Sequence, residues 1–141
     1  YILCDLPLNL DKPLDKSCIG CNACINACVG GALKSGFEIS KCASHISQKK
    51  GELTEGEIDI LKKSGLIFGC DMCQRVCPHN NITPKPMGEF TDDLIHSLNI
   101  EDIENLSNKE FMRKYKNRAF SWRGRNVLLR NLNIFKCLEG K

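Results

Sequence analysis

The sequence predicts an α+β fold in two parts, a small cysteine-rich domain over residues 1–90 and an α-helical segment over residues 91–141. Three observations lead to this prediction. Eight of the ten cysteines lie in or between two short runs, residues 18–28 and 70–77. Residues 32–39 form two short stretches around Ser35-Gly36, which is typical of a β-hairpin. Beyond residue 91, apolar residues recur at helical spacing.

The first cysteine run, Cys18-x2-Cys21-x2-Cys24-x3-Cys28, has the spacing with which bacterial ferredoxins bind [4Fe–4S] clusters. In that arrangement three thiolates bind one cluster and the fourth binds the other cluster of a pair. The second run, Cys70-x2-Cys73-x3-Cys77-Pro78, lacks one cysteine, because Ile67 stands at its leading position. Cys42, which lies between the runs, is the candidate for the missing ligand. The sequence therefore predicts a bacterial-ferredoxin-like domain with two [4Fe–4S] clusters.

We expect the eight thiolates to form two ligand sets, in which the last cysteine of each run binds the cluster of the other run. The first set is Cys18, Cys21, Cys24 and Cys77, and the second is Cys28, Cys42, Cys70 and Cys73. One departure from the ferredoxin pattern is Val29, which replaces the usual proline, a residue that is not a ligand. A structural zinc site is the main alternative, although zinc sites usually pair two C-x2-C halves. Cys4 and Cys137 lie outside the runs, and we expect both to be structural.

The composition indicates a soluble protein of a reducing compartment. The 141 residues begin without a signal peptide, and no apolar run approaches the roughly 18 residues that a membrane span needs. Ten cysteines without a secretion signal favour metal ligation over disulfides. We expect a cytoplasmic monomer with no membrane contact.

Charge is unevenly spread along the chain. Residues 1–106 hold 10 Lys and Arg against 15 Asp and Glu, whereas residues 107–141 hold 10 against 2. Such asymmetry suggests contact with a polyanion, and a solvated helix face is the alternative. The cations of this segment are Arg113, Lys114, Lys116, Arg118, Arg123, Arg125 and Arg130, with Phe120 and Trp122 among them. This pattern indicates contact with nucleic acid.

Helix boundaries follow from capping residues. Thr54 with Glu57 predicts the start of one helix and Gly65 its end. Ser107 with Glu110 predicts a second start. The helices expected in the second part cover residues 92–98, 109–116 and 123–138.

The chain resembles the C-terminal part of the epoxyqueuosine reductase family. The matching features are the run Cys18–Cys28, Cys42 within Lys41-Cys42-Ala43-Ser44, and the element Gly69-Cys70-Asp71-x-Cys73-Gln74-x2-Cys77-Pro78-x-Asn80. Glu110-Phe111 and Arg123-Gly124-Arg125-x3-Leu129-Arg130-Asn131 also fit. The resemblance spans nearly the whole chain; Val29, His45 and Trp122 depart from it.

The resemblance implies a function in queuosine synthesis, in which electrons pass through two clusters to cobalamin and an epoxide oxygen is removed from a tRNA nucleoside. In the family a preceding domain binds cobalamin and carries the catalytic acid, so we expect no turnover by this chain alone. Ser44 and Asp71, beside ligands of the second cluster, are the candidates to face cobalamin. The resemblance also implies an external electron donor. The candidates to bind tRNA are Lys49, Lys50, Arg113, Arg118, Arg123, Arg125 and Arg130.

Two other functions fit the same sequence. A stand-alone ferredoxin-like electron carrier, or a subunit of a redox complex, would keep both clusters and use the basic segment to dock a protein partner. A zinc-stabilised nucleic-acid-binding module would keep the basic segment without redox chemistry. The identity of the bound metal distinguishes the zinc-stabilised module from the other two functions. Affinity for tRNA distinguishes the stand-alone electron carrier from the tRNA-modifying function.

Overall fold

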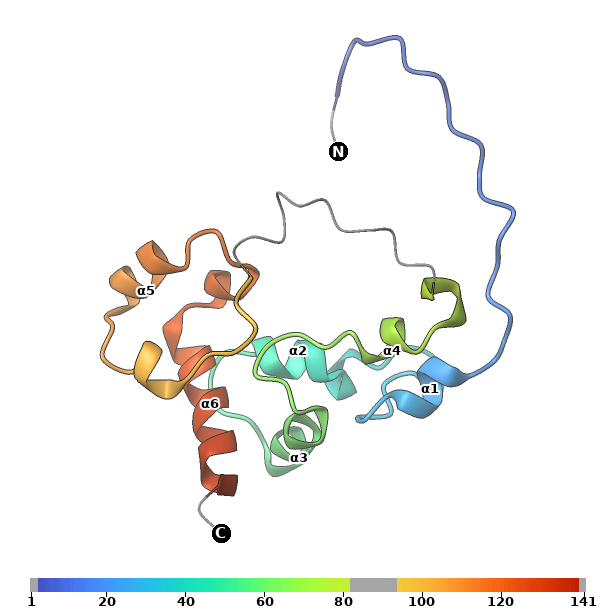
Figure 1. The fold of residues 1–141 in the computed structure, drawn as a ribbon. Coiled ribbons are helices and arrows are strands. Elements are labelled where there is room, and N and C mark those ends of the chain that lie inside the picture. The colour runs from blue at the N-terminus through green and yellow to red at the C-terminus, as the bar shows by residue number, and fades with distance from the viewer. Residues whose placement is uncertain (1–2, 82–93, 140–141) are drawn as a thin grey trace.

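The computed structural model describes residues 3–81 and 94–139, with side chains up to residue 136. All regular structure in these ranges is helical, so the α+β class is not confirmed and the described chain is an all-helical arrangement. Figure 1 shows an extended N-terminal stretch leading into a body of short helices, with α1 and α4 at one end and α5 at the other. The boundary expected at residue 90 lies outside the described residues.

The hairpin predicted over residues 32–39 is wrong. One backbone hydrogen bond, from Glu38 N to Ala32 O at 2.9 Å, closes this loop, and a 3₁₀ helix, η1 (Ile39–Lys41), follows it. The N–H of Ala32 instead donates to the Sγ of Cys28 at 3.3 Å. A strand pair needs backbone N–H groups that donate to carbonyl oxygens across the pair, and here the N–H of Ala32 is bonded to a cysteine sulfur.

Helices α2 (Ala43–Gln48) and α3 (Glu55–Ser64) pack against each other in the centre of the body. Helix α3 has the predicted boundaries. Thr54 Oγ1 accepts from Glu57 N, the Glu57 carboxylate accepts from Thr54 N, and Gly65 ends the helix at φ 67°. Buried Ile46 and Leu61 come from α2 and α3, one from each helix. The sequence therefore predicted this helix from local chemistry alone.

Helices α1 (Ala23–Ala27) and α4 (Met72–Arg75) carry the two cysteine runs and pack against each other. Neither contains a buried residue. Helices of five and four residues are far shorter than an isolated helix needs to be stable in water. The second run continues into η2 (Pro78–Asn80), where Asn80 Nδ2 donates to Gln74 O at 2.8 Å.

The C-terminal part contains the main apolar core. It comprises η4 (Ile100–Asp102), α5 (Asn108–Lys114), η5 (Ala119–Arg123) and α6 (Arg125–Glu139). The buried residues of this apolar core are Ile100, Ile103, Phe111, Tyr115, Leu128 and Leu132, and Ile67 and Phe68 pack against them from the preceding part of the chain. Because α6 also packs against α2 and α3, the described helices of both parts share contacts.

The capping box of Ser107 and Glu110 confirms the predicted start of α5, and α6 confirms the expected final helix. The helix predicted over residues 92–98 is wrong for its described residues, 94–98, which have no regular structure. Asn99 begins the next element instead, because its N–H donates to Asp102 Oδ2 at 2.9 Å and caps η4. Leu94 and Ile95 are exposed, so neither side chain supplies the buried contact that would stabilise a helix there.

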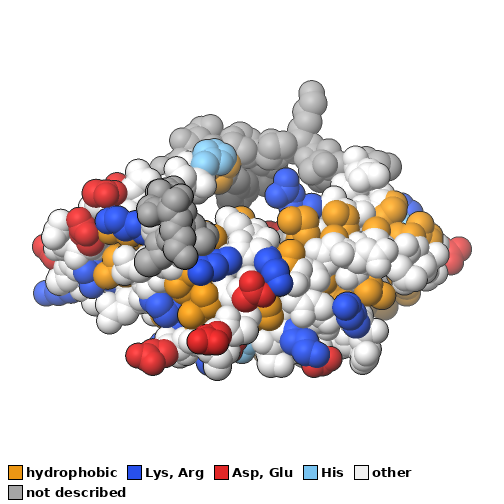
Figure 2. All heavy atoms as spheres, turned by 90° about the horizontal axis from the view of Figure 1, so that it is seen from below, with side chains coloured by type: hydrophobic (Ala, Val, Ile, Leu, Met, Phe, Trp, Pro, Cys, Tyr) orange, Lys and Arg blue, Asp and Glu red, His pale blue; other side chains and the backbone are white. Residues whose placement is uncertain are grey.

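Charges of both signs lie on the face shown in Figure 2, where Lys and Arg are spread over the surface with Asp and Glu among them. No helix within residues 3–81 and 94–139 is long and apolar enough to cross a membrane.

Candidate functional site

Four cysteines from three separate segments line one small, partly enclosed cavity. They are Cys28, Cys42, Cys70 and Cys73, the set predicted for the second cluster. The rest of the wall is largely apolar and includes Val29, Leu33, Phe37 and Met72. The structure therefore brings Cys42 to the same cavity as two cysteines of the second run.

Local sequence explains how these cysteines meet. Cys28 follows α1, Cys42 precedes α2, and Cys70 and Cys73 flank the start of α4. Gly30 lets the segments that contain Cys28 and Cys42 approach each other, because a Cβ atom at this position would collide with the carbonyl oxygen of Lys41. Only glycine permits so close a backbone contact.

A chain of hydrogen bonds fixes the distance between the segments that carry Cys42 and Cys70. Ser47, at the end of α2, is fully buried, and its Oγ accepts from Gly69 N at 3.0 Å, one residue before Cys70. Asn131 of α6 is also fully buried, and its Nδ2 donates to Ser47 O and to Ile67 O, each at 2.7 Å. One amide thus bridges both segments.

Two backbone N–H groups lie within hydrogen-bonding distance of cysteine sulfurs. Ala32 N donates to Cys28 Sγ at 3.3 Å, and Gly20 N donates to Cys18 Sγ at 3.4 Å. Hydrogen bonds of this kind stabilise thiolates and, in iron–sulfur proteins, contribute to the reduction potential.

The first ligand set is more open. Cys18 and Cys21 are exposed, while Cys24 and Cys77 are partly buried. The packing of α1 on α4 places the run that contains Cys24 beside the run that ends at Cys77. The division of all eight cysteines into two sets stays a prediction.

No three His, Cys, Asp or Glu side chains among the described residues are placed to hold a single metal ion. Zinc holds its thiolates at about 2.3 Å, so its ligands converge on one point. Four thiolates are the donor set that one [4Fe–4S] cluster takes, and four cysteines line this cavity.

Ser44 and Asp71 are the candidates to face cobalamin. In the sequence they follow Cys42 and Cys70, two of the cysteines that line the cavity. Ser44 is partly buried, and its Oγ accepts from Gln48 Nε2 at 3.2 Å. Asp71 is exposed at the start of α4, where its side chain makes no capping hydrogen bond. Their contact with cobalamin stays a prediction.

The seven cations proposed for tRNA binding differ in what they contact. Lys49 pairs with Glu57 at 2.7 Å, and this hydrogen bond, with that from the Thr54 backbone, lowers the pKa of Glu57. Arg125 donates to Ile103 O at 2.8 Å and to Glu104 O. These two side chains stabilise the fold.

Arg130 is also used within the protein. It donates to Lys49 O at 2.7 Å and Gly51 O at 2.5 Å, and two of its nitrogens donate to Asn131 Oδ1 at 2.8 and 3.0 Å. Burial lowers the pKa of its guanidinium, which the charge of Glu57 opposes. Arg130 therefore fixes the loop after α2 to helix α6.

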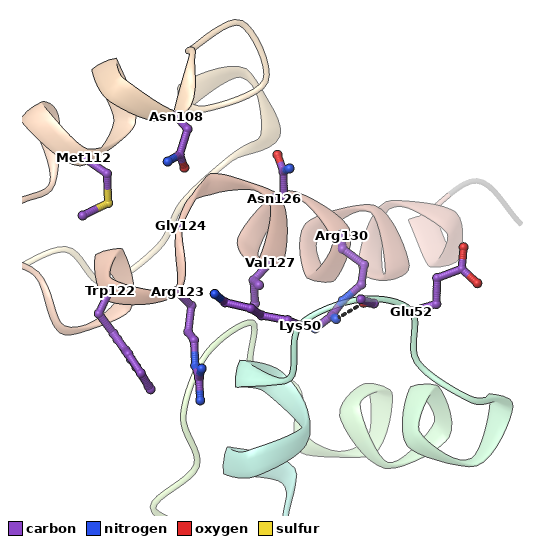
Figure 3. Close-up of a pocket in the computed structure, with 11 residues that line it drawn as sticks. Lys50, Glu52, Asn108, Met112, Trp122, Arg123, Gly124, Asn126, Val127 and Arg130 are labelled. Atoms are coloured by element: carbon purple, nitrogen blue, oxygen red, sulfur yellow. Dashed lines mark hydrogen bonds between the residues drawn. The ribbon is translucent and has the colours of Figure 1, made fainter.

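The remaining four cations differ in exposure. Lys50 and Arg113 are exposed, and Arg118 and Arg123 are partly buried. Lys50 and Arg123 line an open groove of about 860 Å³ between the loop after α2 and the start of α6 (Figure 3). The groove also contains Trp122, which the sequence marked only as an aromatic residue among cations.

Sequence reasoning missed the roles of Ser47 and Asn131. Asn131 had been noted only as part of a matching motif, and its two backbone partners lie 84 and 64 residues away. Nothing in a single sequence indicates contacts at such separations.

Comparison with known proteins agrees with this arrangement. Residues 17–80 match the family model of the 4Fe-4S double cluster binding domain. An epoxyqueuosine reductase of Bacillus cereus is 36% identical over 135 residues, covering 92% of this chain and 35% of the relative. The structure of epoxyqueuosine reductase from Streptococcus thermophilus aligns with a TM-score of 0.74 at 30% identity, covering 92% of this chain and 34% of that one.

A crystal structure of an epoxyqueuosine reductase with an epoxyqueuosine-modified tRNA-Tyr stem loop aligns with a TM-score of 0.68 at 30% identity, over 91% of this chain and 35% of that one. The chain spans about a third of the length of these relatives. The double cluster domain, the similarity over nine-tenths of the chain and the cysteine cavity agree with one another. The chain is therefore homologous to the iron–sulfur portion of the epoxyqueuosine reductase family.

Proposed function

We propose that this chain transfers electrons through two [4Fe–4S] clusters to cobalamin, as part of an enzyme that reduces epoxyqueuosine in tRNA. The observation that carries the proposal is the meeting of Cys28, Cys42, Cys70 and Cys73 at one cavity within the double cluster domain. Two of these cysteines come from the second run, one from the first run, and one from between the runs.

The cavity supports one of the two proposed ligand sets. Cys28, Cys42, Cys70 and Cys73 would hold one cluster, and Cys18, Cys21, Cys24 and Cys77 would hold the other. Each cluster supplies one-electron transfer when bound. Because Cys28 and Cys77 each leave their own run to join the other set, both clusters would lie against the α1–α4 pair.

The protein around the cavity would adjust the reduction potential. Val29 and Leu33, both partly buried, line part of the wall with apolar surface, and the N–H of Ala32 donates to Cys28 Sγ. Solvent exposure and hydrogen bonds to sulfur both influence the potential of such clusters. The exposed cysteines Cys18 and Cys21 would give the first cluster a wetter environment.

The acceptor and substrate rest on the family resemblance. Ser44 and Asp71 would face cobalamin, because each lies within two residues of a second-cluster cysteine. The tRNA would contact the exposed cations Lys50 and Arg113, with Arg123 at the groove. An external electron donor would reduce the first cluster, whose cysteines are the more exposed.

A reductive titration of anaerobically purified protein tests this function. We expect two one-electron steps per chain, each with the loss of visible absorption that accompanies reduction of a [4Fe–4S] cluster. Binding of tRNA at stated salt concentrations tests the substrate. Two redox steps without any tRNA affinity would support the stand-alone electron carrier instead.

A further inference from the structure

We propose that the groove between the loop after α2 and the start of α6 binds one unpaired nucleotide of an RNA strand. The base would stack on Trp122 and the phosphate would contact Lys50 and Arg123. This site rests on the proposed function, because it takes RNA as the ligand. It shares no residue with the cysteine cavity, so it would hold the RNA away from the clusters.

The groove has the size of a ligand site. Its volume of about 860 Å³ lies within the 300–1,000 Å³ that is common for small-molecule pockets. Three stretches distant in sequence line it, within residues 50–52, 108–112 and 122–130. Arg130 holds the first stretch to the third through Lys49 O and Gly51 O, so the groove is held together by internal hydrogen bonds.

One side of the groove suits an anion. Lys50 is exposed there, and the Nε of Arg123 is buried without a hydrogen-bond partner among the described residues. A buried guanidinium N–H without a partner is unfavourable, and a phosphate oxygen would satisfy it. Glu52 is the acidic residue of the lining, and Figure 3 shows its carboxylate directed away from Lys50 and Arg123.

The same side offers an aromatic surface. Trp122 is 57% exposed, and the guanidinium carbon of Arg123 lies 3.6 Å from the centroid of its ring. Figure 3 shows the two side chains extending side by side from η5. An exposed aromatic ring beside cations is the combination with which proteins bind unpaired nucleotides, whose bases stack and whose phosphates pair with Lys and Arg. A duplex hides its base faces, so the site favours single-stranded RNA.

The protein contains one tryptophan, so its intrinsic fluorescence reports on Trp122 directly. We expect an RNA stem-loop with the tRNA-Tyr anticodon sequence to quench this fluorescence. A blunt, fully paired RNA duplex of equal charge should quench it much less. Equal quenching by the two RNAs at equal occupancy would contradict stacking of an unpaired base.

Variants test the two halves of the site. Trp122→Ala should lower stem-loop affinity about tenfold and leave the salt dependence unchanged, whereas Trp122→Phe should retain most of the affinity. Lys50→Gln should lower affinity and reduce the slope of log K against log salt by about 1. The matched controls are Leu94→Ala, exposed and apolar, and Lys62→Gln, exposed on α3, and neither should change binding.

Two failures have different meanings. If wild-type protein binds the stem-loop and Trp122→Ala and Lys50→Gln bind it equally well, the groove is not the site, although the RNA-binding function stands. If wild-type protein binds no stem-loop, the RNA-binding function itself is contradicted, and the groove with it. Cluster absorption, measured on every variant, confirms that each protein is folded and loaded.

Discussion

The side-chain amide of Asn131 donates to the backbone carbonyl of Ser47 at 2.7 Å, across 84 residues of sequence. The same nitrogen donates to Ile67 O at 2.7 Å, and Arg130 supplies donors to the amide oxygen. Ser47 lies on α2, the helix that begins directly after Cys42, and Ile67 lies shortly before Cys70 in the sequence. A buried amide of the C-terminal helix therefore holds together two segments that deliver cysteines to one cavity.

Asn131→Ala should loosen the cysteine cavity. It leaves two buried carbonyl groups without this donor, at a cost of about 1–3 kcal/mol for each group left unsatisfied. Because unfolding of a metal-binding protein is not two-state, the measurement is the rate of iron loss to a chelator, which should rise several-fold. Asn133→Ala, exposed on the same helix, is the control, and equal rates for the two variants would refute the role of Asn131.

Cys42→Ser should damage one cluster and spare the other. The reason is that Ile67 leaves the second run without another thiolate, and Cys42 is the cysteine that completes the cavity. We expect iron and sulfide to fall by about half, measured by chemical analysis and by the spectrum of the reduced protein. Cys4→Ser changes an exposed cysteine outside both runs and should retain both clusters. The ligand sets are wrong if Cys4→Ser loses a cluster and Cys42→Ser does not.

The sequence predicted what depends on local chemistry. The capping boxes of Thr54 and Ser107 lie within four residues, and both helices begin where these residues indicate. The approach of Cys42 to the second run was predictable, because Ile67 leaves that run one cysteine short and Cys42 is the cysteine that lies between the two runs. The hairpin was wrong because the N–H of Ala32 bonds to a sulfur, a competitor that propensity rules do not include. The structural use of Arg130 was not predictable, because its acceptors, the Lys49 and Gly51 carbonyls, lie 81 and 79 residues away.

Arg130→Met and Arg113→Met should have different effects. Arg130 is partly buried and donates to two loop carbonyls, so its loss should make the protein release iron at a lower temperature, because each carbonyl left unsatisfied costs about 1–3 kcal/mol. Arg113 is exposed, and its loss should leave stability unchanged and weaken tRNA binding with a smaller salt slope. Iron retention on warming and tRNA binding at several salt concentrations measure the two effects. Equal destabilisation by both substitutions would contradict the division into structural and exposed cations.

Removing iron should unfold the cysteine runs and spare the C-terminal core. Helices α1 and α4 contain no buried residue, whereas Phe111 and Leu128 are fully buried in the core of α5 and α6. Metal ligation is coupled to folding where the polypeptide alone buries too little. Hydrogen exchange before and after chelation should show protection lost around residues 23–27 and 72–75 and retained in α6. Retained protection in α1 and α4 without iron would contradict this dependence.

Iron, acid-labile sulfide and zinc, measured together in protein purified without oxygen, test the central claim most directly. Two [4Fe–4S] clusters correspond to about eight iron atoms and about eight sulfides per chain, with a broad visible absorption that bleaches on reduction. That is the result expected from the two interlocking sets of cysteines. One or two tightly bound zinc ions per chain, with neither sulfide nor visible absorption, would contradict it.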